Sequence, residues 1–209
     1  MFTRKTTSII ITILSLFIIS VMVYGAAVKK QESESEKYKG WKTYENKEAG
    51  FSLKYPASFV VYEDKINHPG ENEYGKEIIF ASKPRPERPG MNIETYVARG
   101  GYAVIVDSGK NPKSLNLEKF MKEYFHPNIL KNILEAKNKE IKILDGQKAL
   151  MVIDPPLGET SSLEVYLVTQ DKYFFMTLLP YAPKLNQYKE APKILNLMLE
   201  SFKLIEKSK

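Results

Sequence analysis

The strongest pattern along the chain is a long apolar run near its start. Residues 8–28 contain no charged side chain, whereas Arg4 and Lys5 precede the run and Lys29 and Lys30 follow it. A helix rises about 1.5 Å per residue, so about twenty apolar residues cross the roughly 30 Å hydrocarbon core of a bilayer. We therefore expect residues 8–28 to enter a membrane as a helix, with the rest of the chain outside the cytoplasm.

The same run has a second interpretation as a signal peptide. Such a peptide needs a basic start, an apolar core of about 7 to 15 residues and a small-residue cleavage site. Small residues occur at 25–27, within the end of the run. The length of the run favours an uncleaved anchor over residues 1–28, which predicts a single-pass protein of the cell membrane. Cleavage would instead give a secreted domain.

The composition changes directly after the apolar run. Residues 31–37 are Gln, Glu, Ser and Lys only, with no apolar side chain to bury. Such a segment stays solvated. We therefore expect a flexible charged tether over 29–40 and one folded domain over 41–205, because the roughly 180 residues after the apolar run are enough for a single core.

Alternating apolar and polar residues predict strands in the first half of the domain and again later. Phe51, Leu53 and Tyr55 alternate with polar residues, and Pro56 ends the pattern. The pair Asp145-Gly146 between two apolar stretches is typical of a hairpin turn. The further strands are expected at 59–62, 78–80, 102–106, 141–144, 149–153, 163–169 and 173–179. The last two are expected to form a second hairpin, and loops are expected over 67–76 and 83–92, on either side of the strand at 78–80.

Helical spacing appears in the middle and at the end of the domain. Apolar residues recur every three or four positions over 117–125, after a capping Ser114 or Asn116, and again over 129–134. A last helix is expected from about Pro192, a residue suited to a first helical turn. Hairpin-connected strands with helices in the middle and at the end predict an α+β fold, an antiparallel sheet covered by helices.

The order of these segments resembles the PsbP-like family. The likeness is carried by residues 51–59, the helix near 117–125, the hairpin at 143–149 and the end of the domain at 194–203. The resemblance implies an α/β/α sandwich around an antiparallel sheet. It also implies a binding or assembly module and not an enzyme, because the family is not generally catalytic.

Photosynthetic members of that family support the oxygen-evolving complex, partly through an N-terminal arm. Here the apolar segment and the tether stand in the place of that arm, so the resemblance implies a standalone bacterial-type member and not a photosystem subunit. Many such members have no established role, and no functional residue is carried over from the family.

Composition narrows the classes of partner and of chemistry. The formal net charge is +6, with both signs interspersed and no block of Lys and Arg, so we expect no nucleic-acid partner. The chain has no cysteine, which excludes disulfides, thiolate zinc sites and a lipid-modified cysteine. The core alone must therefore hold the domain together.

Catalytic and metal-binding patterns are weak. The nucleophile-elbow, zinc-protease, phosphate-loop and dinucleotide motifs are absent, so we expect no catalytic residue, cofactor or metal, with a hydrolase built on paired carboxylates as the third hypothesis. The histidines are His68 and His126. One of them could join carboxylates such as Glu71, Glu73 or Asp64 to hold zinc or manganese. His68 is otherwise expected to be a solvated loop residue, and His126 the C-terminal cap of the preceding helix.

The most distinctive surface segment is the loop 83–90, which contains three prolines and the two arginines Arg85 and Arg88. These guanidinium groups are candidates for contacting a partner's carboxylates or phosphates, although a rigid connector would look the same.

We therefore expect a non-catalytic domain that binds a protein partner, with a small-ligand or metal-binding domain as the alternative. A partner-binding domain should expose an apolar or charged patch, and a ligand-binding one should form a concave site with converging polar groups. A hydrolase should gather titratable groups with perturbed pKa values in one cleft.

Overall fold

The computed structural model describes residues 34–67, 74–84, 101–153, 161–182 and 184–205. The chain divides into two compact units, Met1–Trp41 and Lys42–Lys209. In the first unit, residues 34–37 form one helical turn, and the rings of Tyr38 and Trp41 meet edge to face with centroids 5.5 Å apart. The predicted anchor over 8–28 lies outside the described residues. No helix in the described ranges is long and apolar enough to cross a membrane.

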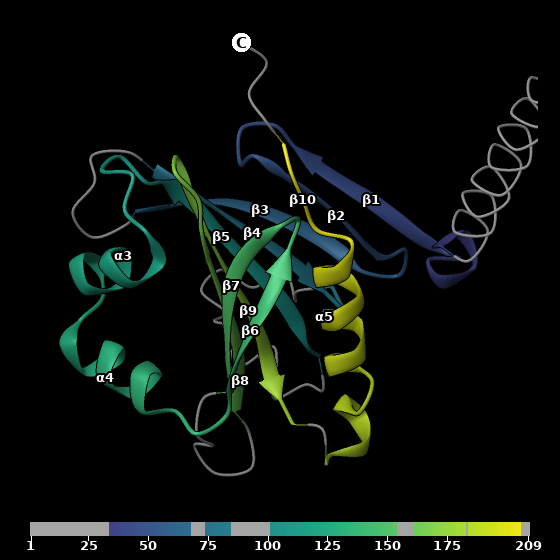
Figure 1. The fold of residues 1–209 in the computed structure, drawn as a ribbon. Helices are drawn as coiled ribbons and strands as arrows, with labels where there is room; N and C mark the ends of the chain where they lie inside the picture. The colour runs from purple at the N-terminus through teal and green to yellow at the C-terminus, as the bar shows by residue number, and fades with distance from the viewer. Residues whose placement is uncertain (1–33, 68–73, 85–100, 154–160, 183, 206–209) are drawn as a thin grey trace, which may run out of the picture. The chain divides into compact units, whose positions relative to one another are not determined.

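The second unit is built on a seven-stranded antiparallel sheet with the strand order β3-β4-β5-β9-β8-β7-β6 (Figure 1). The strands are β3 (Val60–Asn67), β4 (Tyr74–Ala81), β5 (Ala103–Lys110), β6 (Lys139–Leu144), β7 (Gln147–Ile153), β8 (Ser161–Val168) and β9 (Lys172–Tyr181). Strands β3 and β6 are the two edges of the sheet. The predicted hairpins β6–β7 and β8–β9 are both present.

A second, three-stranded sheet was not predicted. It consists of β1 (Trp41–Asn46), β2 (Phe51–Pro56) and the two-residue β10 (Lys203–Leu204), in the order β1-β2-β10. Only β2 has a clear alternating pattern, which ends at Pro56 as expected. Strand β1 is mostly polar, and β10 has two residues, so both depend on backbone pairing with β2 and leave little signal in the sequence.

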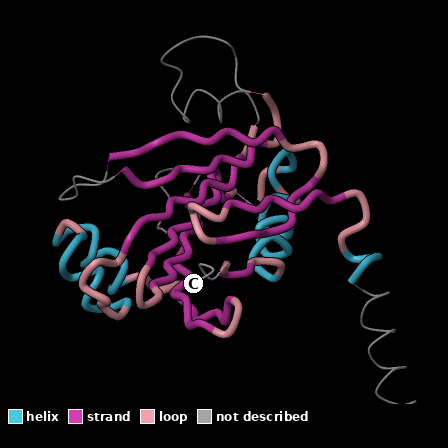
Figure 2. The backbone as a smooth tube through the Cα atoms, turned by 90° about the horizontal axis from the view of Figure 1, so that it is seen from above, coloured by secondary structure: helices cyan, strands magenta, loops and turns pink. Residues whose placement is uncertain are grey.

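Helices cover both faces of the seven-stranded sheet (Figures 1 and 2). The helices α3 (Leu117–Tyr124) and α4 (Pro127–Glu135) lie on one face, and α5 (Ala191–Glu200) on the other. All three match predicted helices. The side chain of Asn116, and not that of Ser114, caps α3 by accepting a hydrogen bond from the Lys119 N–H at 3.0 Å. The domain is therefore an α+β fold with antiparallel sheets, as the sequence predicts.

The larger core lies between the seven-stranded sheet and the elements β2 and α5. Phe51 of β2 is fully buried, stacks on Phe202 with ring centroids 5.6 Å apart and meets Phe174 of β9 edge to face at 5.9 Å. Leu195 and Met198 bring the buried face of α5 into the same layer. Because this core buries one face of the sheet, the apolar residues of each strand must lie on that face.

A second core lies beneath α3 and α4. Met121 and Ile133 from the helices pack with Val152 of β7 and Tyr166 of β8. Beside this core, Tyr173 lies directly over Gly109 of β5, where a Cβ atom would come within 2.3 Å of the phenol oxygen. Any larger residue at 109 would displace that ring.

Several strands are longer than the sequence predicts. Strand β4 begins at Tyr74, although residues 67–76 were predicted as a loop. Asn67 pairs with Tyr74, and Lys76 with Ser108, so neighbouring strands on both sides hold these polar residues in the ladder. Local composition carries no information about such pairing.

Candidate functional site

Most of the predicted site residues lie outside the described part of the chain. This holds for Arg85 and Arg88 of the proline-rich loop and for His68. His126 is described, and the prediction that it caps the C-terminus of the preceding helix was wrong. Phe125 is the C-cap of α3, whereas His126 caps the start of α4, where its Nδ1 accepts a hydrogen bond from the Asn128 N–H at 3.3 Å. Proline at the next position starts a new helix directly, so the histidine faces free N–H groups and not free carbonyls.

The described residues contain no group of three or more His, Asp or Glu side chains placed to hold a metal ion. Metal binding through residues 68–73 falls outside the described ranges. The metal alternative therefore gains no support from the described part of the structure.

The most unusual surface feature is the edge strand β6. Its residues Ile141 and Ile143 are 60% and 62% exposed, although they alternate as a buried strand face would. They pair with Leu150 and Lys148 of β7 and point to the face of the sheet that α3 and α4 cover. The two helices pack over β7, β8 and β9, so the apolar face continues past their cover to the sheet edge. We call Lys139–Leu144 with its free backbone side the β6 edge.

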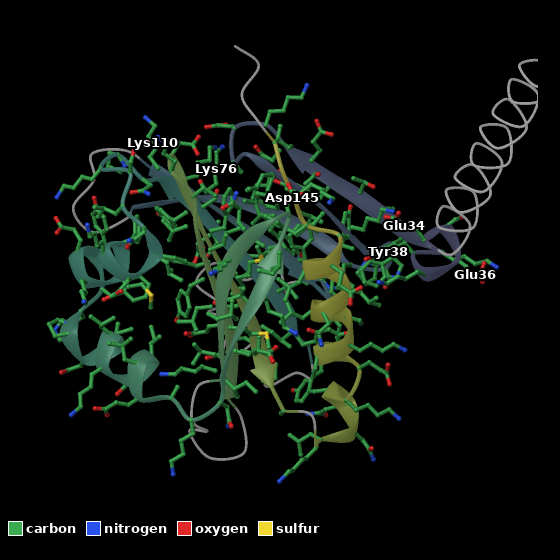
Figure 3. All side chains as sticks on the ribbon, viewed as in Figure 1. Glu34, Glu36, Tyr38, Lys76, Lys110 and Asp145 are labelled. Carbon is green, nitrogen blue, oxygen red and sulfur yellow. The ribbon has the colours of Figure 1, made fainter. Side chains whose placement is uncertain are left out.

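The turn that follows β6 is also held by hydrogen bonds from β10. The sequence predicts a two-residue hairpin turn here, and the positive φ values of Asp145 and Gly146, +45° and +78°, are those of a type I′ turn. The carboxylate of Asp145, a residue labelled in Figure 3, accepts hydrogen bonds from the Leu204 N–H at 2.9 Å and from Lys203 Nζ at 3.0 Å. These bonds hold the pKa of Asp145 below its usual range, and the bond from the Leu204 N–H has the larger effect. The hairpin is thereby tied to β10 and presents a rigid edge.

A second exposed apolar region lies on α4. Ile129 and Leu134 are 52% and 49% exposed. Between α3 and α4 an open hollow of about 290 Å³ is lined mainly by apolar side chains and rimmed by charged ones. Its lining residues are Lys122, Phe125, Pro127, Leu130, Lys131, Leu134 and Glu135. This volume is at the lower end of the range for small-molecule pockets.

One partly buried carboxyl stands apart from both surfaces. Asp107 of β5 lies opposite Glu77 of β4 and Phe175 of β9. Its Oδ1 is buried and accepts no hydrogen bond from the described residues. Burial, with the charge of Glu77 as a smaller cause, raises the pKa of Asp107 to about 7. This carboxyl therefore changes between its neutral and charged forms near neutral pH. Sequence reasoning missed it, although an acid in the alternating series Ile105-Asp107-Gly109 is a visible signal.

Asp107 and Asp145, whose pKa values are shifted, do not line the hollow between α3 and α4. Asp107 and the hollow are thus separate features, and together they do not form the cleft of perturbed titratable groups that a hydrolase needs. The features that remain are the exposed apolar β6 edge and the apolar surface of α4.

Comparisons with known proteins give remote structural similarities only. No family model matches the chain, and no curated protein sequence matches it. The solution structure of cyanobacterial PsbP (CyanoP) from Synechocystis sp. PCC 6803 is similar with a TM-score of 0.48 and 14% identity, covering 79% of this chain and 92% of that one.

Two further solved structures are similar at a lower level. A crystal structure from Bacteroides thetaiotaomicron has a TM-score of 0.41 and 14% identity, covering 81% of this chain and 50% of that one. A protein of unknown function from Pseudomonas aeruginosa has a TM-score of 0.27 and 13% identity, covering 81% of this chain and 99% of that one.

Proposed function

We propose that the chain is a non-catalytic, PsbP-like domain, held outside the cytoplasm by residues 8–28, that binds a protein partner through its β6 edge. The observation that carries the proposal is the exposure of Ile141 and Ile143, 60% and 62%, on an edge strand. Natural proteins usually protect a sheet edge, because its free backbone groups pair readily with another chain. An edge that also presents two neighbouring isoleucines is suited to receiving an added strand.

Two physical terms support binding at this edge. Burying the exposed part of each isoleucine releases apolar surface from water, and each free N–H and C=O along the strand can pair with an incoming backbone. The tie between Asp145 and Leu204 keeps the edge in place before binding, so little conformational entropy is lost. The partner contributes an extended segment with apolar residues at alternate positions.

The test is crosslinking and co-purification of the full-length protein from detergent-solubilised membranes, followed by mass spectrometry. The variant Ile141→Lys with Ile143→Lys places two charges on the β6 edge. The matched control, Ile129→Lys with Leu134→Lys, makes the same change on α4 at similar exposure. We expect the partner to be lost from the β6 variant and retained by the control.

A partner that binds the β6 variant as well as the unchanged protein would overturn the assignment of the surface. A partner lost only from the α4 variant would move the site to the helix pair. The loop residues Arg85 and Arg88 stay a prediction of a partner contact, and Arg85→Ala with Arg88→Ala in the same assay tests them separately.

The second candidate is binding of a small ligand in the hollow between α3 and α4. Its apolar floor with Lys122 and Lys131 at the rim suits a molecule with an apolar body and a carboxylate. A medium-chain fatty acid is the probe. We expect it to raise the melting temperature only if this candidate is correct, and to lose that effect in Leu130→Asp.

A further inference from the structure

We propose that the occupant of the β6 edge is the β6 strand of a second copy of this chain, paired antiparallel about a two-fold axis at Ile141. This inference rests on the proposed function, since it names the partner of the same surface. It follows from the direction of the backbone groups along β6 and from the charges on the strand.

The register of β6 on β7 decides which backbone groups are free. The Asn138 carbonyl accepts a hydrogen bond from the Ile153 N–H at 3.0 Å. In an antiparallel pair, residues whose N–H and C=O point to the partner alternate with residues whose groups point away from it. Residues 140, 142 and 144 therefore bond to β7, whereas Lys139, Ile141 and Ile143 direct their backbone groups to the free edge.

An added antiparallel strand must place its own outward residues opposite these three. For a second β6 strand, three symmetric registers satisfy this condition near the middle of the strand, with the axis at residue 140, 141 or 142. The axis at 140 sets Glu140 opposite its own copy, and the axis at 142 sets Lys142 opposite its own copy. Like charges directly opposite each other on a sheet are destabilising.

The axis at Ile141 removes both clashes. It places Glu140 of each copy opposite Lys142 of the other, next to the ion pair of 2.7 Å that these two side chains already form within one chain. Two acids and two bases then alternate on one face of the joined sheet. The strand is therefore complementary in charge to itself in this one register.

The opposite face of the joined sheet receives the apolar residues. Ile141 meets its own copy across the axis, and Ile143 of each copy lies opposite Lys139 of the other, whose aliphatic stem can cover it. The ladder runs from 139 to 143 on both strands and stops before the turn at Asp145, so the contacts of that residue with β10 are undisturbed. The exposed apolar edge and the unpaired backbone are thus satisfied together.

The absence of cysteine from the chain makes the register directly measurable, because a single introduced thiol can form a disulfide only with another copy. The full-length protein in non-ionic detergent is oxidised as Ile141→Cys, Lys142→Cys or Ile143→Cys, with Ile129→Cys on α4 as the control of similar exposure. Opposed residues have Cα atoms about 5.5 Å apart, within disulfide range, whereas the two copies of residue 143 would be about 14 Å apart.

We expect Ile141→Cys to form disulfide-linked dimers about 10- to 100-fold faster than Ile129→Cys, because pairing raises the local thiol concentration to the millimolar range. A faster reaction of Lys142→Cys would overturn the register. Equal rates at all positions would overturn the pairing itself.

A charge exchange tests the same register without relying on oxidation alone. Glu140→Lys and Lys142→Glu each place like charges opposite each other in a homodimer, but a mixture of the two chains pairs Lys with Glu at both positions. We expect each variant alone to lose dimers in light scattering at high protein concentration, where weak pairing is populated, and the mixture to restore them. Failure of the mixture to associate would refute the proposed register.

The experiments distinguish failure of this inference from failure of the proposed function. If no self-association is found while another protein is captured in a manner that needs Ile141 and Ile143, the second copy is the wrong occupant and the binding surface stands. If neither self-association nor such capture is found, both are wrong.

Discussion

The partly buried carboxyl of Asp107 gives the prediction with the clearest magnitude. Replacing it with asparagine removes a group that ionises near pH 4 in the unfolded chain and near pH 7 in the folded one. Each unit of pKa difference corresponds to about 1.4 kcal/mol, so a shift of about three units corresponds to about 4 kcal/mol. Asparagine keeps the shape of the side chain and cannot ionise.

The sign of the effect follows from which state releases the proton first. As pH rises from about 4, the unfolded chain loses the Asp107 proton while the folded domain keeps it, so the unfolded state is favoured. The contribution of this group is therefore fully present below about pH 4, declines by about 4 kcal/mol up to pH 7 and then stays level. In Asp107→Asn this decline should be missing, and the variant should be more stable than the unchanged protein at pH 8.

The assay is urea denaturation of the full-length protein in non-ionic detergent, followed by far-ultraviolet circular dichroism at several pH values from 4 to 8. Comparing the slopes of unfolding free energy against pH cancels the contribution of the titratable groups that both proteins share. Asp145→Asn is the control, because the pKa of Asp145 is lowered by the Leu204 N–H and its stabilising effect is lost only as pH falls below about 4. Parallel curves for Asp107→Asn and the unchanged protein over pH 4 to 8 would refute the reasoning.

Three further predictions concern stability and use the same denaturation assay at pH 7. Gly146→Ala should cost about 1 to 2 kcal/mol, because φ is +78° and no atom lies near the added methyl group, and a larger loss would show that the hairpin itself fails. Asn111→Ala should cost about 3 kcal/mol, since the buried amide makes three hydrogen bonds with the backbone of Leu115 and Thr169, and Asn111→Asp should not restore the loss. Phe51→Ala should cost about 3 to 5 kcal/mol and Phe51→Leu clearly less, with equal losses contradicting the stacked core.

The strength expected for β6 pairing sets the conditions for its detection. Four isoleucines, each about three-fifths exposed, would contribute about 5 kcal/mol on burial, and the added backbone bonds a few kcal/mol more. Association costs about 4 to 15 kcal/mol in lost freedom of motion. The pairing is therefore weak in dilute solution. Attachment of both copies to one membrane would raise their local concentration, which is a reason to study the full-length protein.

Much of the fold could be predicted because local rules determine it. The alternation around Leu53, the helical spacing from Leu117 and the turn at Asp145-Gly146 each report on nearby residues, and the structure contains the expected strand, helix and hairpin. The wrong prediction that His126 caps the C-terminus of α3 also came from a local rule. His126 follows one helix and precedes another, and the proline after it decides which helix it caps.

What the sequence could not determine depends on contacts between distant parts of the chain. Strands β1 and β10 exist through pairing with β2, which no pattern of their own reveals. Asp107 has a raised pKa because the fold buries it opposite Glu77, thirty positions earlier in the chain. The alternation at Ile141 and Ile143 predicts a buried strand face, yet the position of β6 at the edge of the sheet leaves both exposed. Periodicity determines which residues share a face, whereas the packing of other elements decides whether that face is covered.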